Sequence, residues 1–377
     1  MRKKVYFPGL NSLRFFSALS VIITHVELMK HKFGFANLWS NKLIFHFGGI
    51  GVSFFFVLSG FLVTYLMLEE KRNFNFFSIK NFYLRRILRI WPLYFLILIL
   101  GFFILPKFTY IPFFSEHFID DFFLNFIFYL LILPNIAFSI YYAVPLIGQS
   151  WSIGVEEQFY ILWPIVFNFF KKFTFKLLTY LLIFWVSVKL FFLIFSLYFD
   201  NEIALIVKKN LAMLKFENMI IGAMGALILF EKKSKILNFI YNKTIFFLAA
   251  SGIIISIYVL PELLFDGIHL LHSIFFIVII LNVSTNPNTN FRLESPVLNF
   301  LGKISYGLYM YHLIVIYFVL TLMVRFDIYH ENYSLSTFLL YSQSMIITFL
   351  ISYFSYTFFE KRFLKIKLKF TKVVSSN

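Results

Sequence analysis

Long apolar stretches alternate with short polar segments along nearly the whole chain. A helix needs roughly 20 mostly apolar residues to cross the hydrocarbon core of a bilayer. Ten stretches approach or reach that length, at about 8–29, 44–68, 84–105, 150–170, 176–199, 211–230, 244–260, 267–283, 304–324 and 337–359. This pattern predicts an all-α, polytopic membrane protein with about ten transmembrane helices.

One further apolar stretch, residues 122–140, is ambiguous because Pro134 interrupts it. The positive-inside rule, by which cytoplasmic loops collect Lys and Arg, separates the two alternatives. If the stretch does not span, the loops on one side hold 24 of the 34 Lys and Arg residues and those on the other side hold seven. If it spans, the basic segment 231–243 and the C-terminal tail move to the poorer side. We therefore expect ten spans, both termini in the cytoplasm, and an outer excursion over 106–149 that can dip into the membrane.

The composition excludes several classes of protein. Of the 377 residues, 60% are hydrophobic and 14% are charged, phenylalanine occurs 57 times, and the mean hydropathy is +0.82. Such a chain carries more apolar surface than a water-facing fold can hide, so a soluble enzyme and a disordered chain are excluded. Because the sequence contains no cysteine, it has no disulfide, thiolate nucleophile or Cys-ligated metal.

The net charge of +16 is explained by where the basic residues lie. Most of them form a cytoplasmic collar facing anionic lipid, so membrane lipid is an expected partner and nucleic acid is not. The basic residues 2–4 resemble the start of a signal peptide, but the apolar run behind them is too long and contains Arg14. We expect a single membrane-embedded domain over 1–377, with a core at about 7–363 and a basic cytoplasmic tail at 364–377.

Ionisable residues inside predicted spans are functional candidates by default, because charge is costly in hydrocarbon. Arg14 and His25 stand eleven residues apart on the first span, close to three helical turns, so they share one face about 16 Å apart along the axis. An imidazole suits a general base that acts on a hydroxyl. Alternatively, His25 is an interfacial residue and Arg14 a packing partner, and the spacing alone supports both interpretations equally.

A basic cluster opens the third span on its inner side. Arg85 and Arg89 share a face at i, i+4 with Arg86 between them, and guanidinium groups bind phosphate through paired hydrogen bonds. An ordinary positive-inside flank is the simpler explanation for three arginines. Ser59 and Gly60, on the inner half of the second span, would let either a neighbouring helix or an extended ligand approach the backbone closely.

Two adjacent carboxylates, Glu156 and Glu157, lie more than a turn inside the fourth span. At least one of them should meet a cation or a polar cavity, since unpaired charge is costly there. The cations inside other spans that can serve are Arg14, His25 in its protonated form and Lys215, and we count Lys215 among the residues that line such a cavity.

Further polar residues are candidates for the lining of the same cavity. Trp151 and Ser152 open the fourth span, and Ser305, Tyr309 and His312 form a polar stripe at i, i+4 and i+7 on the ninth. A hydrogen-bonded seam between helices explains the stripe equally well. Ser152 lacks the spacing of a nucleophile elbow, and there is no zincin, P-loop or dinucleotide-binding motif, so we expect no bound metal and no bound cofactor.

Five sequence blocks follow one another along the predicted spans. They are Gly9–His25 with its Arg-x10-His spacing, Gly51–Thr64, Arg85–Tyr94, Trp151–Tyr160 and Ile304–His312. Together they resemble the acyltransferase-3 family of integral membrane acyltransferases. Each block alone is weak, but five in order on a ten-helix layout are specific. The resemblance runs from about residue 7 to 363, nearly the whole chain.

The resemblance implies a function and a location. Members transfer an acyl group, commonly acetyl, from cytoplasmic acyl-CoA to a sugar hydroxyl of a cell-surface or secreted polysaccharide, such as lipopolysaccharide. The implied partners are therefore acyl-CoA as donor substrate, a glycan or lipid-linked glycan as acceptor, and membrane lipid. The implied location is the inner membrane of a bacterium. A transporter or translocator of an envelope glycan is the alternative, because ten spans with buried ionisable residues also suit a carrier.

The resemblance also implies roles for residues. His25 and Arg14 are the implied catalytic pair, and we add Glu156, the buried carboxylate, as a third catalytic candidate. The implied donor site is the cluster Arg85–Arg89, from which the pantetheine arm would pass Ser59 and Gly60 toward His25. His25 would either deprotonate the acceptor or carry the acyl group itself.

The sequence departs from the family pattern at three places. The pair Phe15-Phe16 replaces a small residue, Lys215 stands where arginine is frequent, and the segment 360–362 lacks a proline that often follows its glutamate. These departures concern local geometry more than activity.

Overall fold

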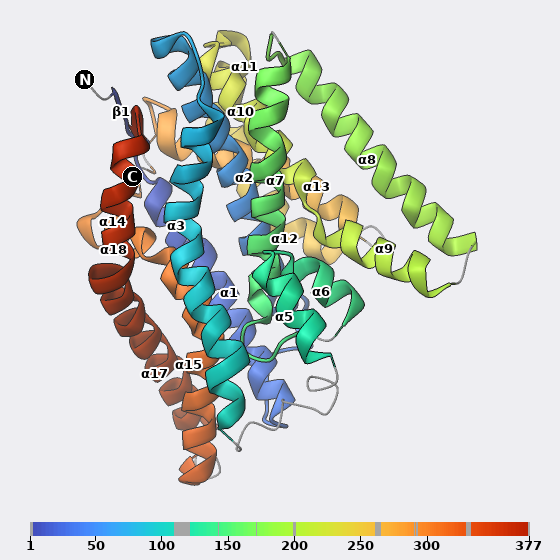
Figure 1. The fold of residues 1–377 in the computed structure, drawn as a ribbon, viewed down its shortest axis with the longest axis vertical. Coiled ribbons are helices and arrows are strands. Elements are labelled where there is room, and N and C mark those ends of the chain that lie inside the picture. Colours follow the sequence, from blue (N-terminus) through green and yellow to red (C-terminus); the bar gives the residue numbers. More distant parts are fainter. Residues whose placement is uncertain are drawn as a thin grey trace.

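The computed structural model describes residues 3–108, 121–141, 143–170, 172–198, 201–260, 265–289, 291, 293–328 and 333–375. The described chain is built almost entirely of helices, which form one elongated bundle (Figure 1). The α-helices are α1 (Leu10–Lys32), α2 (Lys42–Phe74), α3 (Ile79–Ile99), α5 (Phe122–Leu130), α6 (Pro134–Ile140), α7 (Trp151–Phe169), α8 (Phe175–Tyr198), α9 (Glu202–Met213), α10 (Phe216–Phe230), α11 (Ser234–Ile240), α12 (Lys243–Val259), α13 (Phe265–Thr285), α14 (Pro296–Lys303), α15 (Ser305–Arg325), α17 (Tyr333–Phe354) and α18 (Lys361–Lys367).

Shorter elements complete the fold. The π-helices η1 (Leu100–Ile104) and η5 (Ser355–Glu360) extend α3 and α17, and the 3₁₀-helices are η2 (Leu105–Lys107), η3 (Gly148–Ser150) and η6 (Leu368–Phe370). Two three-residue strands, β1 (Lys3–Val5) and β2 (Val373–Ser375), pair in parallel. This pairing was not predicted. It joins the two ends of the described chain at one end of the bundle (Figure 1).

The predicted all-α, polytopic fold is confirmed. Within the described ranges, eight helices are long and apolar enough to cross a membrane, and the pair α11 and α12, bent by 60°, would make a ninth. The predicted span at 150–170 is the 19-residue helix α7, which stands outside that set. Its consecutive polar residues Glu156, Glu157 and Gln158 lower its hydropathy.

The ambiguous stretch 122–140 does not form a spanning helix. It folds as α5 and α6, of nine and seven residues, separated by a break at which Ile132 has φ +61°. At 1.5 Å per residue neither reaches half of the roughly 30 Å hydrocarbon core. Residues 109–120 of the predicted outer excursion lie outside the described ranges.

Local sequence sets where several helices begin. The Oδ1 atom of Asn41 accepts hydrogen bonds from the backbone N–H groups of Leu43 and Ile44, at 3.0 and 3.3 Å, which caps α2. Ser78 caps α3 in the same way through Asn81, at 3.3 Å. Such caps satisfy backbone donors that have no partner inside the helix.

Helix α2 is the central element, against which α1, α10 and α13 pack. The crossing of α2 and α10 brings the two backbones together at Gly60 and Gly222. A Cβ added to Gly60 would overlap the carbonyl oxygen of Met219, and one added to Gly222 would overlap that of Val57. Small residues permit such close crossings in membranes, and this crossing sets the place of the second span relative to the polar residues described next.

Candidate active site

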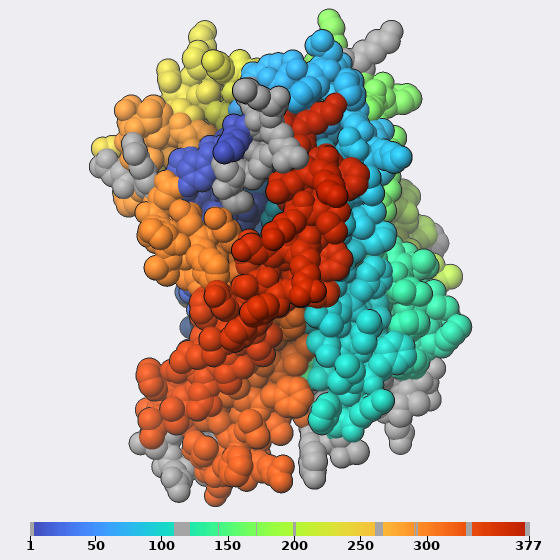
Figure 2. Space-filling view, turned by 60° about the vertical axis from the view of Figure 1, so that its left-hand side comes forward, coloured from blue at the N-terminus to red at the C-terminus, as the bar shows by residue number. Residues whose placement is uncertain are grey.

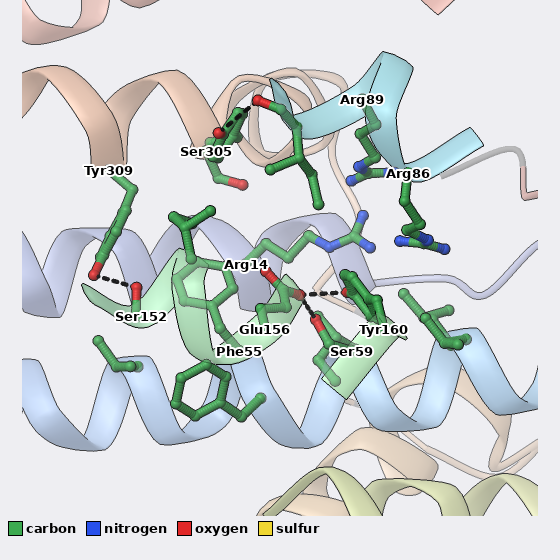
Figure 3. A pocket seen from close by; sticks show the side chains of 18 of the residues that line it. Arg14, Phe55, Ser59, Arg86, Arg89, Ser152, Glu156, Tyr160, Ser305 and Tyr309 are labelled. Atoms are coloured by element: carbon green, nitrogen blue, oxygen red, sulfur yellow. Dashed lines mark hydrogen bonds between the residues drawn. The ribbon is translucent and has the colours of Figure 1, made fainter. Parts of the chain in front are cut away.

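A cavity of about 130 Å³ lies inside the bundle, enclosed by α1, α2, α3, α7 and α15. Its polar lining consists of Arg14, Ser59, Arg86, Arg89, Ser152, Glu156, Tyr160, Ser305, Tyr306 and Tyr309. Eight of these ten residues are sequence-based candidates, and the fold brings them together from five helices. Figure 3 shows the guanidinium groups gathered at one end of the cavity and the Ser152–Tyr309 pair at the other.

Glu156 is held in this cavity by two hydroxyl groups. Ser59 and Tyr160 both donate hydrogen bonds to its Oε1 atom (Figure 3). Tyr160 lies one turn after Glu156 on α7, so the i, i+4 spacing provides one donor and the packing of α2 provides the other. The carboxylate shares the cavity with Arg14 and Arg89. Glu156 therefore meets both a polar cavity and cations, while the buried Glu157 accepts from Trp91 Nε1 at 2.9 Å.

Arg14, one of the predicted catalytic residues, extends from α1 into the cavity. Its Nη1 atom donates to Asn11 Oδ1 at 3.3 Å, and its guanidinium lies near Glu156 in Figure 3. Ion pairs of 4.0 Å or less to Arg14 are absent among the described residues. A guanidinium with few protein partners, facing a cavity, retains donors for a ligand.

At the other end of the cavity, Ser152 and Tyr309 are 2.7 Å apart. Both hydroxyls also reach the carbonyl oxygen of Gln149, Tyr309 at 2.9 Å and Ser152 at 3.3 Å, so either one can be the donor in the contact between them. Ser152 thus acts as a buried hydrogen-bond donor, which does not match the arrangement of a serine nucleophile beside a base.

His25 pairs with a second histidine. The Nε2 atom of His312 lies 2.8 Å from Nδ1 of His25, and Nδ1 of His312 lies 2.6 Å from the carbonyl oxygen of Tyr309. A carbonyl only accepts, so Nδ1 of His312 carries a proton. In neutral His312 the Nε2 atom then accepts from Nδ1–H of His25. This chain of hydrogen bonds leaves the Nε2 lone pair of His25 unprotonated.

The histidine pair lies next to the cavity rather than in its lining. The Tyr309 ring, which lines the cavity, lies 5.8 Å from the His312 ring, centroid to centroid, and makes an edge contact with Phe55 at 6.4 Å. His312 is buried and His25 is half-buried. The polar stripe on α15 was expected either to line a cavity or to form a hydrogen-bonded seam between helices, and it does both. Ser305 and Tyr309 face the cavity, while His312 joins the seam with α1.

The three clustered arginines of α3 have different surroundings. Arg85 is engaged by the protein: Nη2 pairs with Glu70 Oε2 at 3.0 Å, and Nη1 donates to the carbonyl oxygen of Phe370 at 2.9 Å. Arg86 stacks on Tyr160, with 4.8 Å from Cζ to the ring centroid. Arg89 is exposed, and it lines this cavity and a second, larger one. Arg86 and Arg89 are thus the members of the cluster available to a ligand in both cavities.

Besides the two histidines and Arg85, three sequence-based candidates lie outside the lining of this cavity. Gly60 packs on Met219, which favours helix packing over ligand contact. Trp151 packs its ring on Phe56 at 6.2 Å. Lys215, 8% exposed, precedes α10.

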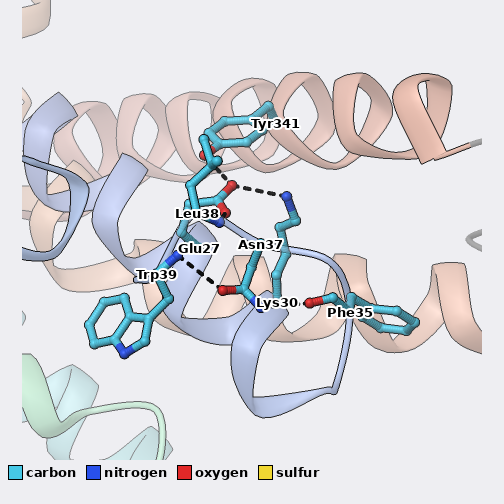
Figure 4. A network of polar contacts seen from close by, with 7 residues as sticks. All are labelled: Glu27, Lys30, Phe35, Asn37, Leu38, Trp39 and Tyr341. Carbon is cyan, nitrogen blue, oxygen red and sulfur yellow. Dashed lines mark hydrogen bonds and ion pairs between the residues drawn. The ribbon is translucent and has the colours of Figure 1, made fainter. Parts of the chain in front are cut away.

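A separate polar network holds the end of α1 that carries His25. Glu27 and Lys30, each 1% exposed, form an ion pair of 3.0 Å, and Glu27 also accepts from the backbone N–H of Leu38 at 2.5 Å and from the Tyr341 hydroxyl at 2.7 Å (Figure 4). The network ties the segment after α1 to α17. The i, i+3 spacing of Glu27 and Lys30 is the sequence signal for the ion pair, whereas Tyr341 is 314 positions away and carries no such signal.

Comparisons with known proteins identify a family and several relatives of this chain. The model of one protein family, described as an acyltransferase domain, matches residues 7–357. A Staphylococcus aureus (strain COL) protein named "Putative O-acetyltransferase" is 27% identical over 335 residues, covering 84% of this chain and 52% of that protein. The O-acetyltransferase OatA of S. aureus (strain NCTC 8325) is 25% identical over 374 residues, covering 94% and 57%.

A third relative shares a shorter segment. A Bacillus subtilis (strain 168) protein named "Putative peptidoglycan O-acetyltransferase YrhL" is 31% identical over 168 residues, covering 42% of this chain and 23% of that protein. The chain spans about half the length of the first curated relatives it matches. No solved structure matches significantly.

Proposed function

The chain belongs to the acyltransferase-3 family, as its five sequence blocks predict, and on that premise we propose that it transfers an acyl group from acyl-CoA to a hydroxyl of a cell-envelope glycan. Acetyl is the simplest group, since the relatives are named O-acetyltransferases. The observation that carries the proposal is the His25–His312 pair, 2.8 Å apart, beside a cavity lined by guanidinium groups.

In the proposed reaction His25 is the general base. Its Nε2 lone pair takes the proton of the acceptor hydroxyl as the oxygen attacks the thioester carbonyl carbon. The new C–O bond forms, the C–S bond breaks, and the proton passes from His25 to the leaving thiolate. An acyl-histidine intermediate would use the same lone pair, so both routes depend on the tautomer that His312 sets.

The arginines would orient the donor. Phosphate groups of coenzyme A suit the guanidinium groups of Arg86 and Arg89, which line both cavities. Arg14 and Glu156 lie between that end and the Ser152–Tyr309 end, where they would contact the acyl-bearing arm.

The names of the relatives support a choice of the first acceptor to test. One of them is named a peptidoglycan O-acetyltransferase, so a peptidoglycan sugar is the first acceptor to test, ahead of lipopolysaccharide. We place the protein in a bacterial cytoplasmic membrane with its termini inside, on the strength of the Lys and Arg distribution.

The test compares glycan from cells with and without the protein by mass spectrometry. The protein should add the mass of one acyl group, and His25→Ala should reduce that product by at least about 100-fold, as loss of a general base does. His31→Ala is the matched control, because His31 is an exposed histidine near the end of the same helix. Full acylation by inserted His25→Ala protein would contradict the assignment, and glycan movement without acyl-CoA consumption would favour a translocator.

A further inference from the structure

The larger cavity has a volume of about 410 Å³. Helix α1, near the start of the chain, and the C-terminal segment with α18 both contribute to its lining. Its charged lining residues are Arg14, Arg85, Arg86, Arg89, Lys303, Lys361, Lys365, Lys367, Glu70 and Glu360. Eight of these are basic and two are acidic. The sequence pointed to the α3 arginines, but it gave no reason to join them to the lysines of the C-terminal segment.

The two carboxylates leave most of this positive charge uncompensated. Glu70 pairs with Arg85 at 3.0 Å, and Glu360 accepts from the Ser355 hydroxyl at 3.2 Å. Within the described ranges, no carboxylate lies within ion-pair distance of Lys361, Lys365 or the other lining lysines. A concave site with a large excess of one charge attracts a multiply charged ligand of the opposite sign.

Two of the lysines on α18 lie on one defined face. Lys361, Leu364 and Lys365 of α18 line the cavity at i, i+3 and i+4, and Leu368 of η6 follows at i+7, the repeat of one helix face. Lys367 also lines the cavity, from outside this repeat. Arg362, on the same helix, is exposed and does not line the cavity. The basic residues of this segment therefore divide into a group that faces the cavity and a group that does not.

Three contacts fix the C-terminal segment against the rest of the protein. Arg85 donates to the carbonyl oxygen of Phe370, Lys372 stacks on Phe76 at 3.8 Å from Nζ to the ring centroid, and β2 pairs with β1. Figure 2 shows the C-terminal segment, in red, running across the molecule between α3 in light blue and the orange α14 region.

We propose that Lys361, Lys365 and Lys367 of the C-terminal segment, together with Lys303, bind the phosphate groups of the nucleotide end of the acyl donor. This assignment rests on the proposed function, in which the donor is acyl-CoA. The α3 arginines would then form one wall of the phosphate site and α18 the opposite one. Arg86 and Arg89, shared by both cavities, lead from this site toward Glu156.

The experiment measures acetyl-CoA binding to the full-length protein in nanodiscs of phosphatidylcholine. The variant Lys361→Gln/Lys365→Gln/Lys367→Gln should raise the Kd at least about tenfold at low salt and flatten its salt dependence. The conservative variant Lys361→Arg/Lys365→Arg/Lys367→Arg should keep the Kd near the wild-type value. The matched control Arg362→Gln/Lys369→Gln removes two exposed cations of the same segment and should change the Kd less than twofold.

The outcomes separate this inference from the proposed function. If the wild-type protein binds acetyl-CoA and the triple glutamine variant binds it equally well, the inference is wrong while the proposed function stands. If the wild-type protein binds no acetyl-CoA, both fail. The same variants are also compared in nanodiscs that contain phosphatidylglycerol. A triple glutamine variant that loses association with phosphatidylglycerol but keeps its affinity for acetyl-CoA would assign the lysines to a lipid headgroup and overturn the inference. Because the arginine variant keeps the same positions filled, a loss confined to the glutamine variant reports charge rather than misfolding.

Discussion

His312 Nε2 lies 2.8 Å from His25 Nδ1, although 287 positions separate the two residues in the chain. The partner of His312 on its other side is the backbone carbonyl of Tyr309, so in neutral His312 the Nδ1 atom donates and the Nε2 atom accepts. In the proposed reaction His312 would thereby position His25, as the orienting group of a catalytic triad does for its base.

Replacing His312 should lower turnover without weakening donor binding. His312→Phe removes the acceptor for Nδ1–H of His25, so its tautomer is no longer set, and kcat should fall on the order of 100-fold. His312→Gln can still present an acceptor oxygen and should recover part of the rate. Steady-state kinetics with varied acetyl-CoA provide the measurement, and an equal fall in donor affinity in both variants would indicate a merely structural role.

Substitutions of Arg89 and Arg85 should have different effects on the donor KM and on the C-terminal segment. Arg89→Gln removes a guanidinium that is open to both cavities and should raise the donor KM by about tenfold, the size of one charge-assisted hydrogen bond. Arg85→Gln breaks the pair with Glu70 and the bond to Phe370, so it should also loosen the C-terminal segment. Limited proteolysis of the tail alongside the kinetics checks both; a larger KM effect at Arg85 with an intact tail would reverse this division of roles.

Gly60 should be intolerant of a side chain for a structural reason. Gly60→Ala places a methyl group against the backbone of Met219, and such overpacking costs about 1–3 kcal/mol of unfolding free energy or more. Gly267→Ala is the control, because nothing lies within 4 Å of a Cβ added there. Thermal unfolding in detergent, followed by size-exclusion chromatography, should show a lower midpoint for Gly60→Ala only. A lowered donor affinity at unchanged stability would instead place Gly60 in the donor site.

Substitutions of Glu27 and Lys30 should have strongly non-additive effects on the free energy of unfolding. Lys30→Met leaves a buried carboxylate without its cation, which costs about 3–5 kcal/mol of unfolding free energy. The double variant Glu27→Gln/Lys30→Met removes both charges and should recover part of that loss. A double-mutant cycle on thermal unfolding measures the coupling, and purely additive effects would show that the pair contributes little.

Much of this protein follows from its sequence alone. Apolar runs of about 20 residues determine the helices, the Lys and Arg distribution determines their expected orientation, and helical spacing puts Glu156 beside Tyr160 on one face of α7. These are local properties, governed by a 3.6-residue period and by the cost of charge in hydrocarbon. The break at Ile132, which divides residues 122–140, was signalled by nearby Pro134.

The tertiary structure alone decided which faces meet. Ser59 reaches Glu156 because α2 packs beside α7, and His25 meets His312 only because α1 packs on α15. The wall of lysines beside the α3 arginines likewise depends on the return of the C-terminal segment to the N-terminal strand. Such contacts join residues far apart in the chain, and they arise from the simultaneous packing of several helices, which no local period encodes.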